Sequence, residues 1–386
     1  MDNPNISVPQ DPCFITGMGW VTPLGNSVDD VWNDLLEGKS GVRPTLSEIP
    51  VRSDLAAIVP TVPLHEGPHS RNLLFAASAV ESALADAGIT IDADGLELIL
   101  GTSYAGNLDD PESPSLYAWA EQVAQRLGYP RPPLCVTTAC SAGSDAVLMG
   151  AELIRSGRRE ICVCVGTDVV TPAKRLGHSM LGTMSDQALR SFDSRHNGMV
   201  LGEGAGVLVL ESADHARARS ARVHALLRGT GSANDAAGMT APDPSGSSVV
   251  LAVERALAGT ALTTDDVAVV SAHGTGTPVN DAVEATSLRT LFGSGAAGPI
   301  VYGTKGALGH SLGACGTIEA ITVVKALEDG LVPPVQGLDT PMDDFPLPLP
   351  AGAPSPVHGT AGLSLTLGFG GFNTALLLSR PGSDHE

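Results

Sequence analysis

The sequence lacks the features that would assign it to a membrane, to nucleic acid or to a secretory route. No apolar run approaches the ~18 to 20 residues that a membrane-spanning helix needs. The N-terminus has neither the basic nor the apolar region of a signal peptide. Basic residues are few, 22 against 42 acidic ones, and the net charge of −20 argues against a nucleic-acid partner. We therefore expect a cytoplasmic protein without membrane or nucleic-acid partners.

Paired cysteines and a dinucleotide-binding fingerprint are absent as well. None of the six cysteines stands in a C-x2-C pair, which disfavours disulfides and structural zinc. The glycine runs lack the G-x-G-x-x-G setting after a first strand, which disfavours a nicotinamide site. The sequence therefore predicts no metal and no cofactor of its own.

Short runs rich in Val, Ile and Leu alternate with helix-like segments along the whole chain. The runs predict strands at 13–19, 96–103, 134–138, 160–167, 206–212, 222–229, 267–273, 300–304, 361–368 and 374–380. The segments between them predict helices near 28–37, 73–87, 115–127, 142–156, 249–258, 281–292 and 314–329. This alternation favours an α/β architecture of parallel sheets covered by helices.

The length of 386 residues suits two medium domains better than one large one. The stretch at 229–246, rich in Gly, Asn, Asp and Pro, is the best candidate for the break between them. We place an N-terminal half at 1–230 and a C-terminal half at 231–386. The same stretch could equally be a long loop inside one domain.

Cys140 lies where a strand-like run meets a helix-like pattern, in VTTACSAGSDAV at 136–147. A helix begins directly after it, and the unpaired N–H groups of a first helical turn favour a thiolate and can hold a developing oxyanion. Small residues follow the cysteine, so a substrate could approach it. Considered alone, Cys140 could also be a buried cysteine at a strand end.

Two histidines and a lysine stand at comparable positions in the second half. His273 follows one apolar strand in SAHGTGTPVND, and Lys305 and His310 follow the next in GTKGALGHSLGAC. Chemistry in α/β sheets gathers beyond the carboxyl ends of the strands, so these side chains could converge with Cys140. A single histidine would more often be structural, but the combination indicates a cysteine nucleophile served by imidazoles.

The stretch LGFGGFN at 367–373 ends a further strand. Its glycines allow unusual backbone angles around one bulky apolar residue, Phe369. It could form a pliable loop that gates a pocket or supplies a backbone N–H to an oxyanion. A plain glycine-rich turn is the alternative.

Four motifs in a fixed order carry a resemblance to a known family. TACSAG, HGTGTPVND, GTKGALGHSLGACGTIEAI and GFGG follow one another along the chain. On these motifs the sequence resembles the β-ketoacyl-acyl-carrier-protein synthases, the thiolase-fold condensing enzymes of fatty-acid and polyketide assembly, and above all their elongating type. The resemblance implies a five-layer αβαβα sandwich made of two similar βαβαβ halves, usually as a dimer.

The resemblance also implies roles for the residues at the matching positions. Cys140 would take an acyl group from a carrier-protein thioester. His273 and His310 would assist decarboxylation of a malonyl extender and stabilise the enolate oxygen. Lys305 would set the electrostatic surroundings of His310, and Glu319 would orient that part of the site.

Further residues would bind the substrate. Backbone N–H groups of Cys140 and Phe369 match the family's oxyanion hole, with Phe369 as gatekeeper. Thr275 and Thr277 would hydrogen-bond the phosphopantetheine arm of the carrier protein, and Asp281 is interpreted as a helix cap rather than a catalyst. The predicted substrate-binding residues are Thr275, Thr277, His178, Gly368 and Gly370.

Several positions depart from the family pattern. FDSRHNGMV stands where the family has F-D-x-x-R-D-G-F, so that His196, Asn197 and Met199 replace Arg, Asp and Phe. His178 replaces an aromatic residue that lines the acyl pocket, and Phe372 stands where a small residue is common. The stretch between Gly101 and Cys140 is also shorter than usual. These departures leave the Cys-His-His set intact, but they bear on the acyl chain and favour a specialised role in secondary metabolism.

We therefore expect a ketosynthase that performs a decarboxylative Claisen condensation between an acyl group on Cys140 and a malonyl group on acyl-carrier protein. One alternative is acyl transfer without decarboxylation to an amine or alcohol. Another is a non-catalytic subunit of the chain-length-factor kind, although such subunits typically lack the cysteine that is present here.

The expected partners are acyl-carrier protein and a second ketosynthase-like subunit, in a homodimer or a heterodimer. An acidic carrier protein would need a local basic patch on a chain of net charge −20. Arg71, Arg126 and Arg131 could contribute to such a patch, or the partner subunit could supply it.

Overall fold

A computed structural model describes residues 11–47, 49–109 and 115–382. The strands of the N-terminal half are β1 (Cys13–Val21), β2 (Val42–Pro44), β3 (Leu55–Ala57), β4 (Leu96–Gly101), β5 (Leu134–Val136), β6 (Ile161–Asp168) and β7 (Gly204–Glu211). Its α-helices are α1 (Val28–Leu36), α2 (Gly67–Ala87), α3 (Leu116–Leu127), α4 (Ala142–Arg155), α5 (Pro172–Met180) and α6 (Ala213–Ala218). The strands of the C-terminal half are β8 (Ala225–Asn234), β9 (Val267–Ser271), β10 (Ile300–Tyr302), β11 (Leu331–Val332), β12 (Ser355–Pro356), β13 (Ala361–Gly368) and β14 (Phe372–Ser379). Its α-helices are α7 (Ser247–Leu257), α8 (Pro278–Phe292), α9 (Lys305–Leu308) and α10 (Cys315–Asp329).

Every strand and helix expected from the sequence is present, with shifts of a few residues at most ends. The elements that were not predicted are short or carry little apolar periodicity. They are the helices α5, α6 and α9 and the strand pairs β2–β3 and β11–β12.

Ten strands pair side by side in the order β10-β9-β13-β14-β8-β1-β7-β6-β4-β5. The five strands from β5 to β1 belong to the first half and the five from β8 to β10 to the second, and the antiparallel pairing of β1 with β8 joins them. The prediction of parallel sheets is wrong for this arrangement, because only the pairs among β4, β5 and β6 and among β9, β10 and β13 are parallel. β14 follows β13 through a tight turn, which permits only antiparallel pairing.

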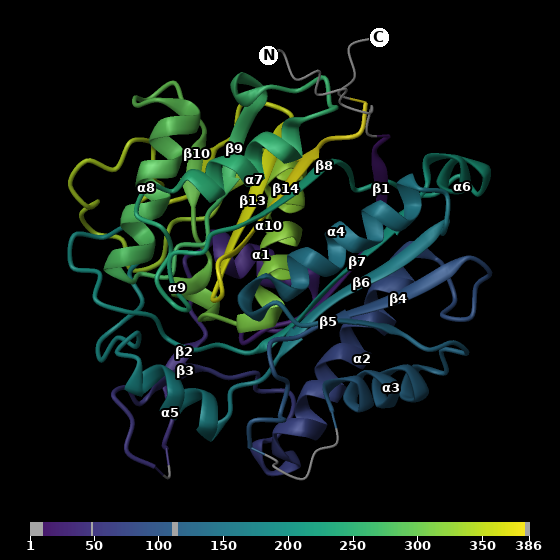
Figure 1. The fold of residues 1–386 in the computed structure, drawn as a ribbon, viewed down its shortest axis with the longest axis horizontal. Coiled ribbons are helices and arrows are strands. Elements are labelled where there is room, and N and C mark those ends of the chain that lie inside the picture. The colour runs from purple at the N-terminus through teal and green to yellow at the C-terminus, as the bar shows by residue number, and fades with distance from the viewer. Residues whose placement is uncertain (1–10, 48, 110–114, 383–386) are drawn as a thin grey trace.

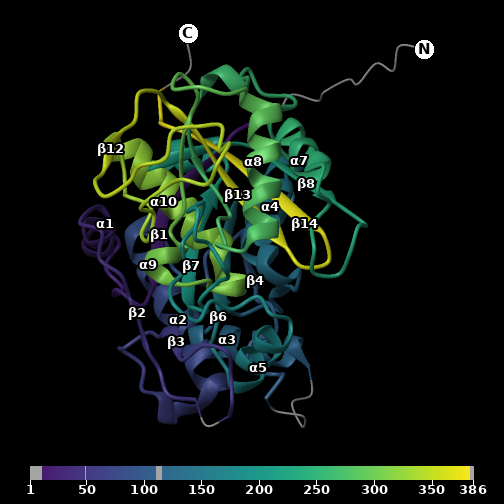
Figure 2. The same cartoon turned by 90° about the vertical axis from the view of Figure 1, so that its left-hand side faces the viewer.

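Helices separate and cover the two groups of strands (Figure 1). α4 and α10 pack against each other and contact strands of both groups, so they form a central layer. α2 covers the outer face of β1, β6 and β7, with α3 beside it, and α7 covers β8 and β14, with α8 beside it. Figure 2 shows the same layers from the side, with α2 and α3 at the opposite end of the stack from α7 and α8. This is the five-layer αβαβα sandwich that the resemblance implies.

The central helix α10 is buried almost along its whole length. Every residue from Cys315 to Leu327 is buried, as is expected for a helix with apolar residues on all sides. α4 approaches it so closely that a Cβ at Gly316 would lie 2.0 Å from Ser144 Oγ. The two helices therefore hold fixed positions between the halves, and the segments directly before them form the site.

The predicted domain boundary at 230/231 falls within β8, and the loop at 235–246 follows that strand. The division into two domains stays a prediction. In the part of the chain that the structure describes, we find no helix with the length and apolar character of a membrane span.

Candidate active site

Cys140 lies in a sharp turn between β5 and α4. A single 3-10 turn at Ala139–Ser141 leads directly into α4. Ala139 has φ +51°, a left-handed conformation that costs a non-glycine residue about 1–3 kcal/mol and often marks functional sites. The turn places Cys140 just before the first turn of α4, with a side chain that is only 5% exposed.

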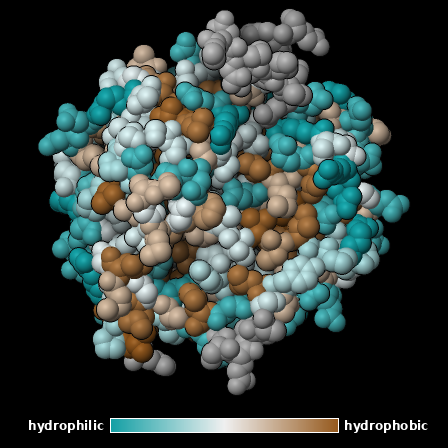
Figure 3. Space-filling model, in the orientation of Figure 1, coloured by the Kyte–Doolittle hydropathy of each residue, from teal (hydrophilic) through white to brown (hydrophobic). Residues whose placement is uncertain are grey.

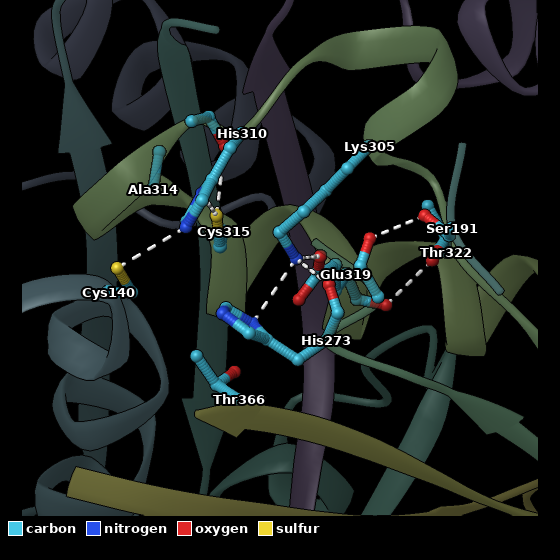
Figure 4. A network of polar contacts seen from close by, with 12 residues as sticks. Cys140, Ser191, His273, Lys305, His310, Ala314, Cys315, Glu319, Thr322 and Thr366 are labelled. Carbon is cyan, nitrogen blue, oxygen red and sulfur yellow. Dashed lines mark hydrogen bonds and ion pairs between the residues drawn. The ribbon is translucent and has the colours of Figure 1, made fainter. Parts of the chain in front are cut away.

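His310 and His273 converge on this cysteine from the second half. His310 Nε2 lies 3.4 Å from Cys140 Sγ. The His273 ring meets the His310 ring edge to face, with centroids 5.2 Å apart and an interplanar angle of 86°. Figure 4 shows both imidazoles between Cys140 and Lys305. The structure thus brings together the residues that the sequence placed beyond separate strands, while their catalytic roles stay a prediction.

Hydrogen bonds on Nδ1 fix the tautomer of His310. The Leu312 backbone N–H donates to His310 Nδ1 over 3.2 Å, and Cys315 Sγ lies 3.0 Å from the same nitrogen. Because Nδ1 accepts, the ring proton is on Nε2, the nitrogen that faces Cys140. His310 therefore presents an N–H donor to the sulfur.

Lys305 fixes His273 in the same way. Its ammonium group lies 3.3 Å from His273 Nδ1, donates to the His273 carbonyl oxygen, and forms an ion pair with Glu319 (Figure 4). Since an ammonium group only donates, His273 Nδ1 accepts and its proton is on Nε2. Lys305 was expected to set the electrostatic surroundings of His310; its charge acts on His310 from a distance, and its direct contact is with His273.

Burial and charge keep both imidazoles neutral. Burial first, and then the charge of Lys305, hold the pKa values of His273 and His310 well below the usual range. Burial also acts to lower the pKa of Lys305, but the Glu319 carboxylate outweighs it and raises that pKa above its usual value. Burial raises the pKa of Glu319 to about 7 despite the lysine beside it. The site therefore contains neutral N–H donors backed by a buried ion pair.

Burial disfavours the thiolate form of Cys140. Burial raises its pKa to about 11, although the charge of Lys305 and a hydrogen bond from the Phe369 backbone N–H act in the opposite direction. Desolvation thus acts against the sequence-based expectation of a favoured thiolate. A thiolate at this position would lie next to the N–H groups of His310 and Phe369.

The GFGG stretch forms the turn between β13 and β14 and covers the cysteine. A Cβ on Gly368 would lie 2.9 Å from Ser141 Oγ, so that only glycine permits the close approach of the two turns. Gly370 has φ +84°, and its N–H donates to the Met239 carbonyl oxygen over 2.8 Å. Phe369 is thus held over Cys140 with its N–H toward the sulfur.

A pocket of about 280 Å³ leads to Cys140. The predicted residues that line it are Cys140, His273, His310, Thr275, Thr277, Gly368, Phe369 and Gly370. Thr275 Oγ1 and Thr277 Oγ1 lie 2.8 Å apart along its wall. Lys305 and Glu319 stand behind the imidazoles rather than in the pocket.

His178 lies outside this pocket, on α5. Its ring centroid is 5.7 Å from that of Phe369, and its Nδ1 lies 3.1 Å from Thr183 Oγ1. Burial, followed by the charge of Lys174, lowers its pKa to about 4. His178 therefore packs against the Phe369 ring as a neutral side chain, and its contact with the acyl chain stays a prediction.

Two acids on α8 position the His273 loop, and sequence reasoning missed one and misread the other. The Glu284 carboxylate accepts hydrogen bonds from the backbone N–H groups of His273 and Gly274, at 2.7 and 2.6 Å. Asp281 is not a cap, because Thr277 occupies the N-cap position of α8. The Asp281 carboxylate accepts from the Gly276 N–H over 3.1 Å and lies 2.8 Å from the Nδ1 atom of His196. The sequence contained one clue to a shared role of these acids, since residues 280, 281 and 284 are spaced to lie along one face of a helix.

A metal ion would not suit the arrangement of the reactive groups. Cys140, His273 and His310 each place a possible ligand atom within 4.8 Å of the others. Binding through the two Nε2 atoms would require a proton on each Nδ1, where Leu312 and Lys305 already donate. The expectation of no metal stays a prediction.

The basic patch expected from three arginines does not form as predicted. Arg71 is 1% exposed and forms a buried ion pair with Glu203, so it cannot meet a partner protein. Arg131 donates to the Leu96 carbonyl oxygen over 2.6 Å and is half-buried, which leaves Arg126 as the exposed member of the set.

Two family models match the chain. The model described as β-ketoacyl synthase, N-terminal domain, matches residues 10–69 and 68–216, and that of the C-terminal domain matches 224–339. The 3-oxoacyl-(acyl-carrier-protein) synthase 2 of Synechocystis sp. is 30% identical over 405 residues, which covers 95% of this chain and 97% of the relative. The protein of the same name from Rhizobium meliloti is 32% identical, with coverage of 95% and 98%.

Solved structures agree with these relatives. A β-ketoacyl synthase from Burkholderia phymatum superposes with a TM-score of 0.86 at 27% identity, covering 96% of this chain and 99% of the other. A type II polyketide ketosynthase, bound to a hexaketide and in complex with its acyl-carrier protein, gives 0.88 at 27% identity, with coverage of 96% and 100%. The ishigamide ketosynthase/chain length factor gives 0.87 at 30% identity, with coverage of 97% and 100%.

Proposed function

The chain belongs to the β-ketoacyl synthase family, and we propose that it condenses an acyl group on Cys140 with a malonyl group on acyl-carrier protein. It is a ketosynthase of fatty-acid or polyketide biosynthesis and therefore an acyltransferase. The observation that carries the proposal is the 3.4 Å contact between Cys140 Sγ and His310 Nε2, with a second neutral imidazole beside it.

The first step is acyl loading. Cys140 Sγ attacks the carbonyl carbon of the carrier-bound thioester and forms the new C–S bond. The bond between that carbon and the carrier's sulfur breaks, and the carrier leaves as a thiol with the proton that Cys140 loses. The N–H groups of Phe369 and Cys140 stabilise the oxyanion of the tetrahedral intermediate. His310 Nε2–H stabilises the thiolate whose formation burial otherwise disfavours.

The second step forms the carbon–carbon bond. Malonyl-carrier protein loses carbon dioxide, and the resulting enolate oxygen accepts hydrogen bonds from the Nε2–H groups of His273 and His310. The enolate carbon attacks the Cys140 thioester, the C–S bond breaks, and the sulfur recovers a proton. Neutral imidazoles suit this step. Because their pKa values are low, they donate hydrogen bonds to the enolate oxygen without transferring a proton to the enolate.

The proposed reaction also needs a carrier protein, and it takes place in the cytoplasm. Thr275 and Thr277 hold the phosphopantetheine arm, which enters as part of the substrate, and the site uses no metal. The chain works in the cytoplasm with acyl-carrier protein and with a second ketosynthase-like subunit, either identical or related. Relatives that were solved with a carrier protein and with a chain length factor support this proposal.

Mass spectrometry of the protein with acyl- and malonyl-carrier proteins tests the proposal. We expect an acyl adduct on Cys140, followed by release of carbon dioxide and a product two carbons longer. An adduct without loss of carbon dioxide from any malonyl donor would contradict the condensation and indicate acyl transfer to another acceptor. The absence of any adduct would indicate a non-catalytic subunit.

A further inference from the structure

The mouth of the pocket is bordered by exposed apolar side chains from three separate segments. Leu181 follows α5, Met239 lies in the loop after β8, and Val279 lies in the first turn of α8. Their exposed fractions are 53%, 85% and 53%. Single exposed apolar residues are common on protein surfaces, but three around one opening form a patch of the kind that binds partners. Figure 3 shows hydrophobic residues gathered over α5, at the lower left of the molecule.

Formal charge is missing from the same opening. Among the described residues that line the pocket there is no Asp, Glu, Lys or Arg. Arg52 lies beside the rim, where its Nη1 would be 3.9 Å from a Cβ on Gly182, and the backbone of Arg190 lies against Gly276, between the two pocket threonines. The pocket lining thus carries no formal charge on a chain with a net charge of −20, although it includes polar side chains such as Thr240 and Asn280.

We propose that acyl-carrier protein docks on this chain mainly through the apolar rim formed by Leu181, Met239 and Val279, and not through an ionic patch. This inference rests on the proposed function, since the thioester must pass this rim to reach Cys140. The carrier that fits has an apolar surface around the attachment point of its arm. Long-range repulsion between two acidic proteins opposes their approach, and the neutral rim removes that repulsion from the contact itself.

The two modes of docking predict opposite effects of salt. Ionic docking weakens as salt screens the attraction, so the KM for acyl-carrier protein would rise. Apolar docking between two acidic proteins gains from screening of their repulsion, so the KM stays level or falls as sodium chloride rises from about 0.05 to 0.5 M. The acyl adduct on Cys140 provides the readout.

Rim variants give the second measurement. Leu181→Glu, Met239→Glu and Val279→Glu place a carboxylate in the contact, and each should raise the KM for acyl-carrier protein about tenfold or more. The KM for a short acyl-pantetheine thioester, which needs no docking, should change far less. Leu251→Glu is the matched control, because Leu251 is 39% exposed on the outer helix α7 and should leave both constants unchanged.

Two outcomes would overturn the inference, and a third would overturn the proposed function on which it rests. A KM that rises with salt and with Arg52→Ala, while the rim variants behave like the control, would show ionic docking. A change in the oligomeric state of the rim variants, measured by analytical ultracentrifugation, would make the rim a contact between copies of the chain. If neither acyl-carrier protein nor the acyl-pantetheine thioester forms an adduct on Cys140, the proposed function itself would be overturned.

Discussion

The two halves of the molecule are built alike, yet they contribute unequally to the site. The first half supplies one reactive atom, the sulfur of Cys140, on a strained turn before α4. The second half supplies His310 and the Phe369 N–H, which contact that sulfur, and His273, whose ring packs against His310. In the proposed reaction the sulfur changes its protonation state, whereas the two imidazoles keep theirs. The second half therefore contains the electrostatic network.

Each half also contains a buried lysine–carboxylate pair, and the two pairs differ in what the lysine contacts. Lys174 pairs with Asp168 in the first half, and Lys305 pairs with Glu319 in the second. Lys174 donates its other hydrogen bonds to backbone carbonyl oxygens, while Lys305 also contacts Nδ1 of His273. Similar ion pairs thus stabilise a loop in one half and set a tautomer in the other.

Removal of the sulfur should have the largest effect. Cys140→Ala should abolish acyl loading completely and leave the fold intact, since a small apolar side chain replaces another at a buried position. Intact-protein mass spectrometry and circular dichroism check the two expectations. Acyl loading that survives the substitution would contradict the assignment of the nucleophile.

Loss of an imidazole should separate the two steps. His310→Ala should lower condensation by about 10²–10⁴-fold and acyl loading by much less, because loading also has the Phe369 N–H. Single-turnover measurements of adduct formation and of carbon dioxide release compare the steps. An equal loss in both would mean that His310 acts mainly on the thiol.

Substitution of the two buried lysines should affect stability in both halves but condensation in only one. Lys174→Met and Lys305→Met should each reduce the free energy of unfolding by about 3–5 kcal/mol, since each leaves a buried carboxylate unpaired. Only Lys305→Met should also reduce condensation in the folded fraction, because His273 loses the donor to its Nδ1. Denaturant titration and turnover of the same samples test both.

The double variant Lys305→Met/Glu319→Leu sharpens that test. It removes both charges, so it should recover most of the stability but none of the lost condensation. Recovery of activity together with stability would show that Lys305 serves only the fold.

The smallest expected effect is the pH dependence of alkylation at Cys140. With a pKa raised to about 11, the thiolate fraction should rise about tenfold for each pH unit between about 7 and 9. The rate of iodoacetamide labelling, followed by mass spectrometry, should rise in proportion. A rate that is already constant at about pH 7 would show that the helix start outweighs burial after all.

The sequence predicted the strands and helices well, because their apolar periodicities are long, and it found Cys140, His273 and His310 because each follows a strand. It did not predict the antiparallel strands, since pairing direction depends on how the chain returns. Glu284 was missed because its partners are backbone N–H groups, which leave no trace in residue identity. Cys140 was assigned a thiolate because the degree of burial is a property of the folded layers.

The burial of α10 also determines how the protein should lose activity. A helix surrounded by both halves exposes its amides only when the layers separate, so its hydrogen exchange should follow global unfolding. The same helix carries Cys315 and Glu319, which position the imidazoles from behind. The proposed catalytic residues and the helix that we expect to exchange most slowly are therefore packed together as one unit. Heating should not produce a folded but inactive intermediate, and the midpoints for inactivation and for unfolding should coincide.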